Sequence, residues 1–423
     1  MCKSIMGPVQ RKVTYRLYPR RKQEEGLRLL LSRHQRLYNA ALEQRISAYR
    51  RQGKTVSFAE QCRDLTVLRG DDPEYEEVNA QSCQVTLKRL DLAFKHFFRR
   101  VRKRKGKAGF PRFKSLRRFS GWGYKTHGDG WRLQAGEGMK HGRLRLSGVG
   151  SIRIRGTART EGTPKTLEVM HKQGRWYASV TVVCEPKRSR VGNGAAGLDW
   201  GVETFATVAN KDGTTLRIEN PRHLQQARKD LTAAQRNLSR KKRGSRNRDK
   251  ARRKVTALHR KVGNRRHDFL HQQSAALVTT LAVLATEDLQ IANMTRSAKG
   301  TVEAPGKNVR QKAGLNRNIL DTAPAAFLQM LKYKAEEAGT EWVEVPTRQV
   351  KPSQTCHGCG KQRKKPLAER QHRCECGACC SRDENAARVM LAWATGPTGR
   401  EPSRCGGGAL APPVKHETPP IAA

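Results

Sequence analysis

The sequence is poor in acidic residues and has no long apolar runs. Of its 423 residues, 37 are Asp or Glu and 85 are Lys or Arg, which gives a formal net charge of +48. A protein this basic repels itself unless a polyanion compensates it. Nucleic acid is the commonest such partner, because Lys and Arg release counterions from its phosphates. The lack of any run of about 18 apolar residues argues against a membrane span.

The sequence shows no secretory signal before its first charged segment, so we expect a cytoplasmic protein. Its 11 cysteines would stay reduced in that compartment, where clustered cysteines are more typical of metal sites than of disulfides. The length suggests about three domains.

The N-terminal half predicts a short strand, two helices and a β-rich region. The strand, Val13 to Tyr18, ends at Pro19, and a helix with regularly spaced apolar residues follows it. A second helix, "QVTLKRLDLAFKHFFRRVRKR", carries an apolar stripe that we expect to pack in a helix–helix core. The stripe consists of Leu87, Leu90, Phe94, Phe97, Phe98 and Val101. From 121 to 183, alternating apolar and polar residues predict antiparallel β-structure, which could form a small barrel.

The second half begins with "GLDWGVETFATVAN", which predicts a strand, a tight turn and a returning strand. Residues 240–266 hold fourteen Lys or Arg and one acid. An apolar stripe within them predicts a packed helix that presents its charges to a partner. The run "LAVLATEDL" predicts a buried strand, "APAAFLQMLKYKAEEAG" a helix ended by Gly339, and "EWVEV" a strand closed by Pro346. The Gly- and Pro-rich tail after Ala394 predicts disorder.

Six cysteines lie between Ser353 and Leu391. They include a Cys-x-x-Cys-Gly pair, Cys356 and Cys359, and a Cys-x-Cys-Gly pair, Cys374 and Cys376, with fourteen residues between the pairs. Two such pairs predict a tetrahedral structural zinc site. The second pair is one residue tighter than usual, so other residues remain possible substitutes, and an incidental cysteine cluster is the alternative interpretation. The possible substitutes are Cys379, Cys380, His357 and His372.

Three carboxylates lie on elements that the pattern predicts to be buried or to border the core. Asp199 lies in an apolar strand, Glu287 follows an apolar run, and Asp383 opens a helix after the cysteines. Singly, Asp199 could form a turn, Glu287 could be a surface acid, and Asp383 could be an N-cap. Together they could bind Mg²⁺, a cation that prefers oxygen ligands. Metal ions in such a cluster activate water and stabilise the leaving oxygen of a phosphodiester.

Three segments resemble the RuvC motifs and zinc ribbon of the TnpB family of transposon-encoded RNA-guided nucleases, and of the compact type V CRISPR effectors related to it. They are "GLDWGVETFATV", "LATEDLQIANM" and "CHGCG…CECGACCSRDENAARVM". The resemblance covers roughly residues 10–394 and includes "FPRFKS" and the basic segment near 240.

The resemblance implies an α+β multidomain fold: an N-terminal wedge β-barrel with an inserted helical recognition lobe, then an RNase H-like α/β RuvC domain with an inserted zinc ribbon. The implied boundaries are 1–20 and 115–190 for the wedge, 21–114 for the lobe, 191–349 for the RuvC domain with its first two motifs and the basic helix, 350–380 for the zinc ribbon, 381–394 for the third RuvC motif, and 395–423 for a disordered tail. In such a fold the ribbon is inserted just before the last catalytic acid, so cysteines and Asp383 would be adjacent in sequence.

The resemblance also implies an activity, namely RNA-guided cleavage of double-stranded DNA. Asp199, Glu287 and Asp383 would be the catalytic acids that bind Mg²⁺ or Mn²⁺, and the four paired cysteines would bind Zn²⁺. The family usually has Asp-Arg-Asp where this chain has "SRD", so Ser381 replaces the first, non-catalytic acid. Gln84 aligns with a family position that faces DNA, and an ordinary exposed polar residue is the alternative interpretation. From their charge we expect further nucleic-acid contacts at Arg246, Arg248, Arg252 and Arg253.

The partners implied are a structured guide RNA, held mainly through phosphates and shape, and a DNA target flanked by a short motif. Two alternatives stay open: a guided DNA-binding protein that does not cleave, or a zinc-ribbon transposase or DNA-binding protein that uses no RNA. Whether the gene belongs to a transposon or a CRISPR locus also stays open.

Overall fold

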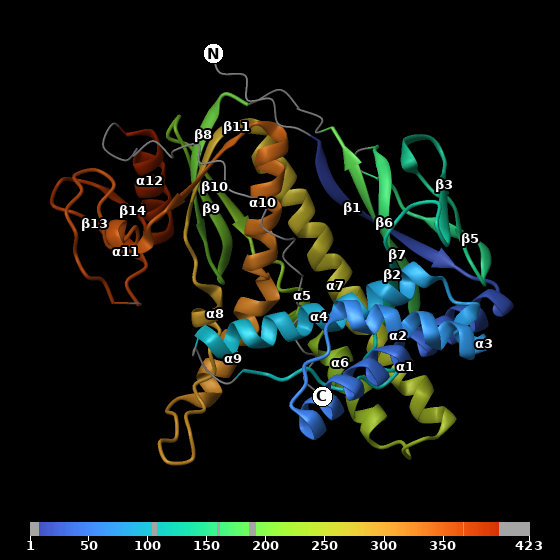
Figure 1. Cartoon of the computed structure of the whole chain (residues 1–423). Helices are drawn as coiled ribbons and strands as arrows, with labels where there is room; N and C mark the ends of the chain where they lie inside the picture. Colours follow the sequence, from blue (N-terminus) through green and yellow to red (C-terminus); the bar gives the residue numbers. More distant parts are fainter. Residues whose placement is uncertain (1–7, 104–107, 159–160, 186–191, 367, 397–423) are drawn as a thin grey trace. The chain divides into compact units, whose positions relative to one another are not determined.

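The computed structural model describes residues 8–103, 108–158, 161–185, 192–366 and 368–396 (Figure 1). The protein has a mixed α/β fold and forms two compact units. The first consists of Met1–Lys187 and Ala227–Asn264, and the second of Arg188–Gln226 and Arg265–Ala423. Among the described helices, none combines the length and the apolar character that crossing a bilayer requires. The predicted disorder of the tail concerns residues 397–423, which lie outside the described chain.

The first unit is built on a seven-stranded sheet whose strand order is β2-β6-β7-β1-β5-β4-β3. The strands are β1 (Val9–Tyr18), β2 (Gly121–Tyr124), β3 (Trp131–Ala135), β4 (Gly142–Leu146), β5 (Gly150–Arg155), β6 (Thr163–Lys172) and β7 (Arg175–Cys184). All its pairs are antiparallel. The pairing of the described strands leaves β2 and β3 as the two edges, so the sheet is open where the sequence suggested a barrel.

Four helices separate β1 from β2 in the chain. They are α1 (Arg21–Gln52), α2 (Phe58–Asp71), α3 (Pro73–Glu76) and α4 (Ala80–Lys103). Alternate residues of the strands, such as Tyr15 and Ile152, are fully buried and share one core with Leu27 of α1 and Leu90 of α4. One face of the sheet therefore packs on the helices, while the intervening residues of each strand point to the other face.

The apolar stripe of α4 is only half used in this core. Leu87 and Leu90 are buried, but Phe98 and Val101 remain 49% and 47% exposed. The expectation that the whole stripe forms a helix–helix core is therefore wrong for its second half. Phe94 still packs against this core and makes an edge contact with Phe110. Phe97, one turn later, also contacts Phe110, so the end of α4 packs on the segment that follows the helix.

The second unit contains a five-stranded sheet with the order β10-β9-β8-β11-β12. The strands are β8 (Gly194–Trp200), β9 (Thr204–Asn210), β10 (Thr215–Glu219), β11 (Leu281–Glu287) and β12 (Glu341–Val345). β8, β9 and β10 form an antiparallel meander, while β11 is parallel to both β8 and β12. The predicted strand–turn–strand and both later strands are confirmed.

Helices of 4 to 35 residues lie between or after these strands. They are α5 (His223–Gln226), α6 (Arg228–Ser239), α7 (Arg246–Thr280), α8 (Ile291–Met294), α9 (Val309–Thr322), α10 (Pro324–Ala338), α11 (Thr347–Val350) and α12 (Arg382–Thr395). Gly339 ends α10 in the left-handed conformation, as predicted. α7 contains most of the predicted basic helix and continues well beyond it; its residues up to Asn264 belong to the first unit.

Each face of the second sheet has its own core. Leu198 of β8 and Leu284 of β11 share a core with Leu277 of α7 and Leu331 of α10. The neighbouring Ala285 points the other way and packs with Met390 of α12. Figure 1 shows α12 beside this sheet. Because side chains alternate along a strand, every second residue of β8 and β11 faces α12.

Candidate active site

Asp199 and Glu287 are neighbours on adjacent parallel strands. The register pairs Leu198 of β8 with Thr286 of β11, so the next residues along the two strands are Asp199 and Glu287. Glu287 lies two residues after Ala285, which faces α12. Both carboxylates therefore lie on the α12 face of the sheet, at the carboxyl ends of their strands.

Asp383 comes to the same site from α12, in whose first turn it lies. The three predicted acids, separated by up to 184 positions in the chain (383 − 199), are thus brought to one end of one sheet face. All three are half-buried. The structure does not make Asp383 an N-cap, because the cap of α12 is Ser381, whose Oγ accepts a hydrogen bond from the backbone N–H of Glu384 at 3.2 Å.

Gly197 lets α12 approach β8 this closely. A Cβ at Gly197 would lie 1.9 Å from the carbonyl oxygen of Ala387, a position that no side chain can share. Gly197 precedes Asp199 by two residues and therefore lies on the same face. The glycine of "GLDWG" was visible in the sequence, but its role as the contact point for a helix almost 190 residues later was not.

The electrostatics of the site reflect this crowding of negative groups. Burial raises the pKa of Asp199 well above its usual range, and the nearby carboxylates of Glu287 and Asp383 raise it further, while Arg382 acts in the opposite direction. Burial also raises the pKa of Glu287. Groups that oppose ionisation of one another in this way would be stabilised by a bound cation.

The donor set fits a hard divalent cation. Within the described chain, none of the three carboxylates takes part in a salt bridge or a side-chain hydrogen bond, so their oxygens are free to coordinate. Their oxygens do not all lie within 4.8 Å of one another, in contrast to the cysteines described below. The adjacent Glu384 is not available in the same way, because Arg388 donates to it at 2.7 Å and Arg217 lies 3.8 Å away.

The four paired cysteines form a second cluster in the same unit. The Sγ atoms of Cys356, Cys359, Cys374 and Cys376 all lie within 4.8 Å of one another. Two cross-pair Sγ–Sγ distances, Cys356 to Cys376 and Cys359 to Cys374, are 3.6 Å. Four thiolates around zinc at about 2.3 Å would be roughly 3.8 Å apart, so the set fits a tetrahedral zinc ion. Cys379 and Cys380, on the small strand β14 (Cys379–Ser381) that pairs with β13 (Gln371–Arg373), are outside this group.

Both glycines that follow the pairs occupy left-handed backbone positions. Gly360 has φ +74° and Gly377 has φ +87°, conformations that favour glycine and turn the chain back at each pair. In the second turn the backbone N–H of Cys376 and the thiol of Cys359 favour the thiolate of Cys374, so its pKa falls to about 7. The backbone N–H of Ala378 lowers the pKa of Cys376, but hydrogen bonds with the other three cysteines favour its thiol and outweigh this effect, so its pKa is raised to about 12. A thiol with a lowered pKa is a better metal ligand at neutral pH.

His357 lies beside the cluster and forms a second possible ligand group with Cys356 and His372. Both ring nitrogens of His357 already have partners, however. Nδ1 donates to Oδ1 of Asn385 at 3.0 Å, and Nε2 accepts from Arg388 at 3.3 Å. The geometry therefore favours four cysteines over a set that includes His357.

Asn385 connects the cysteine cluster to the carboxylates. Its side chain is fully buried. Oδ1 also accepts from the backbone N–H of His357 at 3.1 Å, and Nδ2 donates to the carbonyl oxygen of Thr355 at 2.7 Å and to that of Pro352 at 3.3 Å. Asn385 follows Asp383 by two residues, so this clamp holds the start of α12 against the first cysteine pair. The role of Asn385 was not predicted from the sequence, where only its position two residues after Asp383 could have drawn notice.

The predicted nucleic-acid residues lie in the first unit. Gln84 is exposed on α4, and Arg246, Arg252 and Arg253 are exposed on α7. Arg248 has an internal role, because its Nη1 donates to the carbonyl oxygen of Lys241 at 2.8 Å and to that of Leu238. Arg252 pairs with Asp249 at 2.9 Å.

Comparison with known proteins gives the family. The chain is 33% identical over 350 residues to "Putative RNA-guided DNA endonuclease InsQ" of Escherichia coli (strain K12), covering 80% of both proteins. It is 32% identical over 413 residues to a protein of the same description, without the name InsQ, from Streptomyces pristinaespiralis, covering 96% of this chain and 93% of that one. The chain belongs to the TnpB family.

Three family models match parts of this TnpB-family chain. Residues 178–298 match a "Probable transposase" model, residues 325–390 a Cas12f1-like TNB domain, and residues 6–54 a helix-turn-helix domain. The last range is β1 and the single continuous helix α1 in the structure. A cryo-EM structure of a Cas12f1–sgRNA–target DNA complex aligns over 90% of this chain and 99% of that chain at 15% identity and a TM-score of 0.33, a likeness that supports no conclusion.

Proposed function

We propose that this protein is an RNA-guided DNA endonuclease that hydrolyses target phosphodiesters at a metal-dependent RuvC-type site. The observation that carries the proposal is the convergence of Asp199, Glu287 and Asp383 on the α12 face of the second sheet. There burial, and after it the charges of Glu287 and Asp383, raise the pKa of Asp199. Half-buried like charges at the carboxyl ends of strands are costly without a cation, and a nuclease that uses divalent metal needs such a cluster.

The strand order of the sheet supports the proposal that the second unit has an RNase H-like fold. Its order, with an antiparallel meander followed by two parallel strands on the other side of β8, places the first acid on the central strand and the second acid on its parallel neighbour. In this proposal β1 with β2–β7 is the wedge, α1–α4 the recognition lobe, 191–349 with 381–394 the nuclease domain, and 350–380 the zinc ribbon.

In the proposed reaction the three carboxylates hold Mg²⁺ or Mn²⁺, which supplies activation of the attacking water and stabilisation of the leaving oxygen. Asp199 and Glu287 are positioned by the strand register, and Asp383 by the first turn of α12. Gly197 and Asn385 act through position, since one allows α12 to approach β8 and the other fixes the start of α12.

Zinc, held by Cys356, Cys359, Cys374 and Cys376, would be structural. With four thiolate ligands no coordination position remains open, so chemistry at the metal is not expected. The ribbon would contact target nucleic acid and, through Asn385, maintain Asp383 in place.

Base pairing with a guide RNA would select the target sequence, while the protein would read a short flanking motif, with Gln84 as a candidate contact. The names of the relatives, which include "RNA-guided", support this assignment. The exposed arginines of α7 would contribute phosphate contacts.

Cleavage of a plasmid that carries the target and a randomised flank tests the proposal. We would compare purified protein with its copurified RNA, protein stripped of RNA, and stripped protein with RNA restored, each with and without Mg²⁺. We expect site-specific cutting only with RNA and Mg²⁺. Site-specific cutting by the stripped protein would favour a guide-independent transposase, and guided binding without cutting would favour a guided repressor.

A further inference from the structure

The four cysteines of the cluster differ in their access to water. Cys356 is only 2% exposed, whereas Cys359 and Cys376 are exposed and Cys374 is half-buried. Four thiolates outweigh the charge of Zn²⁺, so the loaded cluster is an anion. Water can hydrate the exposed sulfur atoms, but the buried sulfur of Cys356 depends on donors and charges that the protein supplies.

One donor to this sulfur comes from the backbone of the first cysteine pair. The N–H of Gly358 points to Sγ of Cys356 at 3.4 Å. A Cβ at Gly358 would lie 3.3 Å from Sγ of Cys376, so a larger residue would crowd the cluster. A backbone amide carries only a partial charge, so it leaves most of the negative charge of the buried sulfur uncompensated.

Two buried polar side chains lie on the same side of the cluster. Lys365 is 6% exposed and His372, on β13, is 2% exposed. Nζ of Lys365 donates to Nδ1 of His372. A ring nitrogen of His372 also lies within 4.8 Å of Sγ of Cys356. Lysine, imidazole and sulfur thus form a buried row, an arrangement that is costly unless its charges and hydrogen bonds match.

The lysine fixes which nitrogen of His372 carries the proton. An ammonium group has donors and no acceptor, so Nδ1 accepts and the proton of a neutral ring is on Nε2. Burial lowers the pKa of His372, and the charge of Lys365 lowers it further, which keeps the ring neutral. Within the described chain Nε2 is buried and has no hydrogen-bond partner. A buried N–H without an acceptor is costly, and the thiolate of Cys356 would supply one.

Two other residues near His372 are poorer acceptors. The ring of His357 lies 6.0 Å away between centroids, but both its nitrogens already have partners. Cys380 is opposite His372 in the pairing of β13 with β14, yet it is outside the group that Cys356 forms with the two histidines. Burial raises the pKa of Cys380, so it remains a thiol, which accepts more weakly than a thiolate.

The buried ammonium group lacks a carboxylate partner. Within the described residues Lys365 forms no salt bridge with Asp or Glu, and the nearby Glu369 pairs with Arg363 instead. Burial lowers the pKa of Lys365, the charges of Glu369 and Cys356 raise it, and those of Arg363 and Arg382 act in the opposite direction. The buried cation and the buried sulfur therefore act on each other across the imidazole ring.

We propose that Lys365 supplies the counter-charge, and His372 the hydrogen bond, that hold the buried sulfur of Cys356 on zinc. The inference rests on the zinc site of the proposed function and concerns what keeps the metal there. Nε2–H of His372 donates to Sγ, and Lys365 polarises the ring from its other side. Neither residue is a zinc ligand; both act through Cys356. Because a nearby cation and an N–H donor reduce the cost of a buried anion, zinc leaves the cluster more slowly with this pair than without it.

The test uses paired variants of the full-length, zinc-loaded protein. His372→Phe keeps a ring without a donor, while His372→Gln keeps an N–H group. Lys365→Met removes the charge, while Lys365→Arg keeps it. The matched control is Lys364→Met, which removes one positive charge from an exposed neighbour for which no salt bridge is described. Transfer of zinc to excess EDTA gives the release rate, and the zinc content before the transfer gives the loading.

We expect His372→Phe and Lys365→Met to release zinc at least about ten-fold faster than the wild type and the control, with His372→Gln and Lys365→Arg within about three-fold of the wild type. Release from His372→Phe at the wild-type rate would overturn the proposal. So would release from His372→Gln as fast as from His372→Phe, because the donor would then be irrelevant. Equal acceleration in Lys364→Met and Lys365→Met would show a general effect of charge and would also overturn it.

Absorption spectra of the Co²⁺-substituted proteins separate this role from a purely structural one. A sulfur atom that loses an N–H donor is richer in electrons, so its charge-transfer band should move to longer wavelength in His372→Phe and stay in place in His372→Gln. Loss of folding would weaken the bands without moving them, and an unmoved band in His372→Phe would overturn the proposal. Loss of the metal from both variants would make His372 a ligand, with the same consequence.

The wild type distinguishes this inference from the proposed function. Wild-type protein that binds neither Zn²⁺ nor Co²⁺ would remove the zinc site of the proposed function, and this inference with it. Wild-type protein that binds the metal while the variants behave like it would overturn this inference alone.

Discussion

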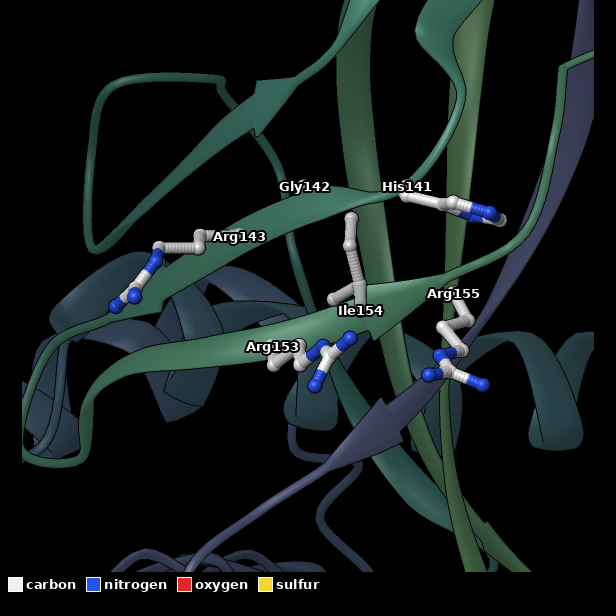
Figure 2. Close-up of a pocket in the computed structure, with 6 residues that line it drawn as sticks. All are labelled: His141, Gly142, Arg143, Arg153, Ile154 and Arg155. Carbon is white, nitrogen blue, oxygen red and sulfur yellow. The ribbon is translucent and has the colours of Figure 1, made fainter.

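The sheet of the first unit and the carboxylate site of the second both hold like charges together, but in opposite ways. Arg143 of β4 is opposite Arg153 of β5, and with Arg155 they line a cavity of about 370 Å³ (Figure 2). These arginines are exposed, whereas the three acids are half-buried and converge on the end of one sheet face. Exposed charges keep their water and repel one another weakly, but the interaction strengthens as water is excluded. Burial therefore decides whether a set of like charges needs a bound counter-ion.

The cysteine cluster is a third example of the same principle. Its four sulfur atoms lie closer together than the carboxylate oxygens do, within 4.8 Å of one another. Thiolates at this spacing are stabilised by one tetrahedral cation. In our proposal the second unit holds two cation sites, and Asn385 joins the segments that carry them. The following predictions would break or sharpen this division.

The largest effect should come from removing one acid. We expect Asp199→Asn or Asp383→Asn to lower the cleavage rate by about 10²-fold or more, because each removes a charged metal ligand, while guide and target binding stay unchanged. Plasmid cleavage and filter binding measure the two properties on the same preparation. Residual cutting near the wild-type rate would show that the residue is not a ligand.

Loss of a cysteine should be the next largest effect. Cys356→Ser should remove bound zinc and unfold the segment between about 350 and 380, because metal binding supplies folding free energy there. Zinc content by atomic emission and proteolysis of the segment check this. Cys379→Ser serves as the control, since Cys379 is outside the cluster. If Cys379→Ser lost zinc while Cys376→Ser kept it, Cys379 and not Cys376 would be a zinc ligand.

Breaking the link between the two cation sites should have an intermediate effect. Asn385→Ala leaves buried backbone groups of His357 and Thr355 without their partner, which should lower the free energy of unfolding by about 2–3 kcal/mol. Because Asp383 is in the same turn, we also expect slower cleavage, on the order of ten-fold, at full zinc content. Cleavage kinetics and zinc content are measured on the same preparation. A variant that is less stable but cleaves at the wild-type rate would show that Asn385 does not position Asp383.

The carboxylate site should also make stability depend on pH and Mg²⁺. The pKa of Asp199 is raised in the folded state, so the folded protein binds this proton more tightly than the unfolded chain, whose Asp titrates near 3.9. The free energy of unfolding should therefore fall as pH rises from about 4 through the raised pKa. Mg²⁺ should oppose this fall and increase the melting temperature at pH 7–8 by roughly 2–5 °C.

Asp199→Asn is the control for that measurement. It has no proton to lose, so its melting temperature should depend less on pH and respond less to Mg²⁺. Melting curves at several pH values, with and without added Mg²⁺ and with zinc retained, make the comparison. Equal responses in the wild type and the variant would place the pH dependence elsewhere.

The smallest effect should come from Ser381, the position where the family usually has an acid. Ser381→Ala removes the cap of α12 and should destabilise it by about 1 kcal/mol, with most of the cleavage retained. Ser381→Asp keeps a capping oxygen and should restore the stability. If Ser381→Ala were as inactive as Asp383→Asn, the assignment of the third acid would be wrong.

Much of the second unit was predictable from the sequence because its signals are local. The apolar runs of β11 and β12, the glycine after α10 and the spacing of the cysteine pairs each depend on a few neighbouring residues. The three acids stood out because charged residues beside apolar strands are costly. The resemblance to the TnpB family, confirmed by the relatives, grouped them into one site before any geometry was known.

What only the tertiary structure decided are the relations between distant segments. β1 pairs with β5 and β7, more than 130 positions later, and that register alone makes Arg16 face Arg155. The pairing of β8 with β11, which puts Asp199 beside Glu287, also joins distant segments. So does the close approach of the backbone of Ala387 to Gly197. The exposed end of the α4 stripe was mispredicted for the same reason, since periodicity shows that a helix has an apolar face but not where its partner ends. Alternation along a strand is a property of the backbone and can be read from sequence, whereas the choice of partner strand depends on the packing of the whole core.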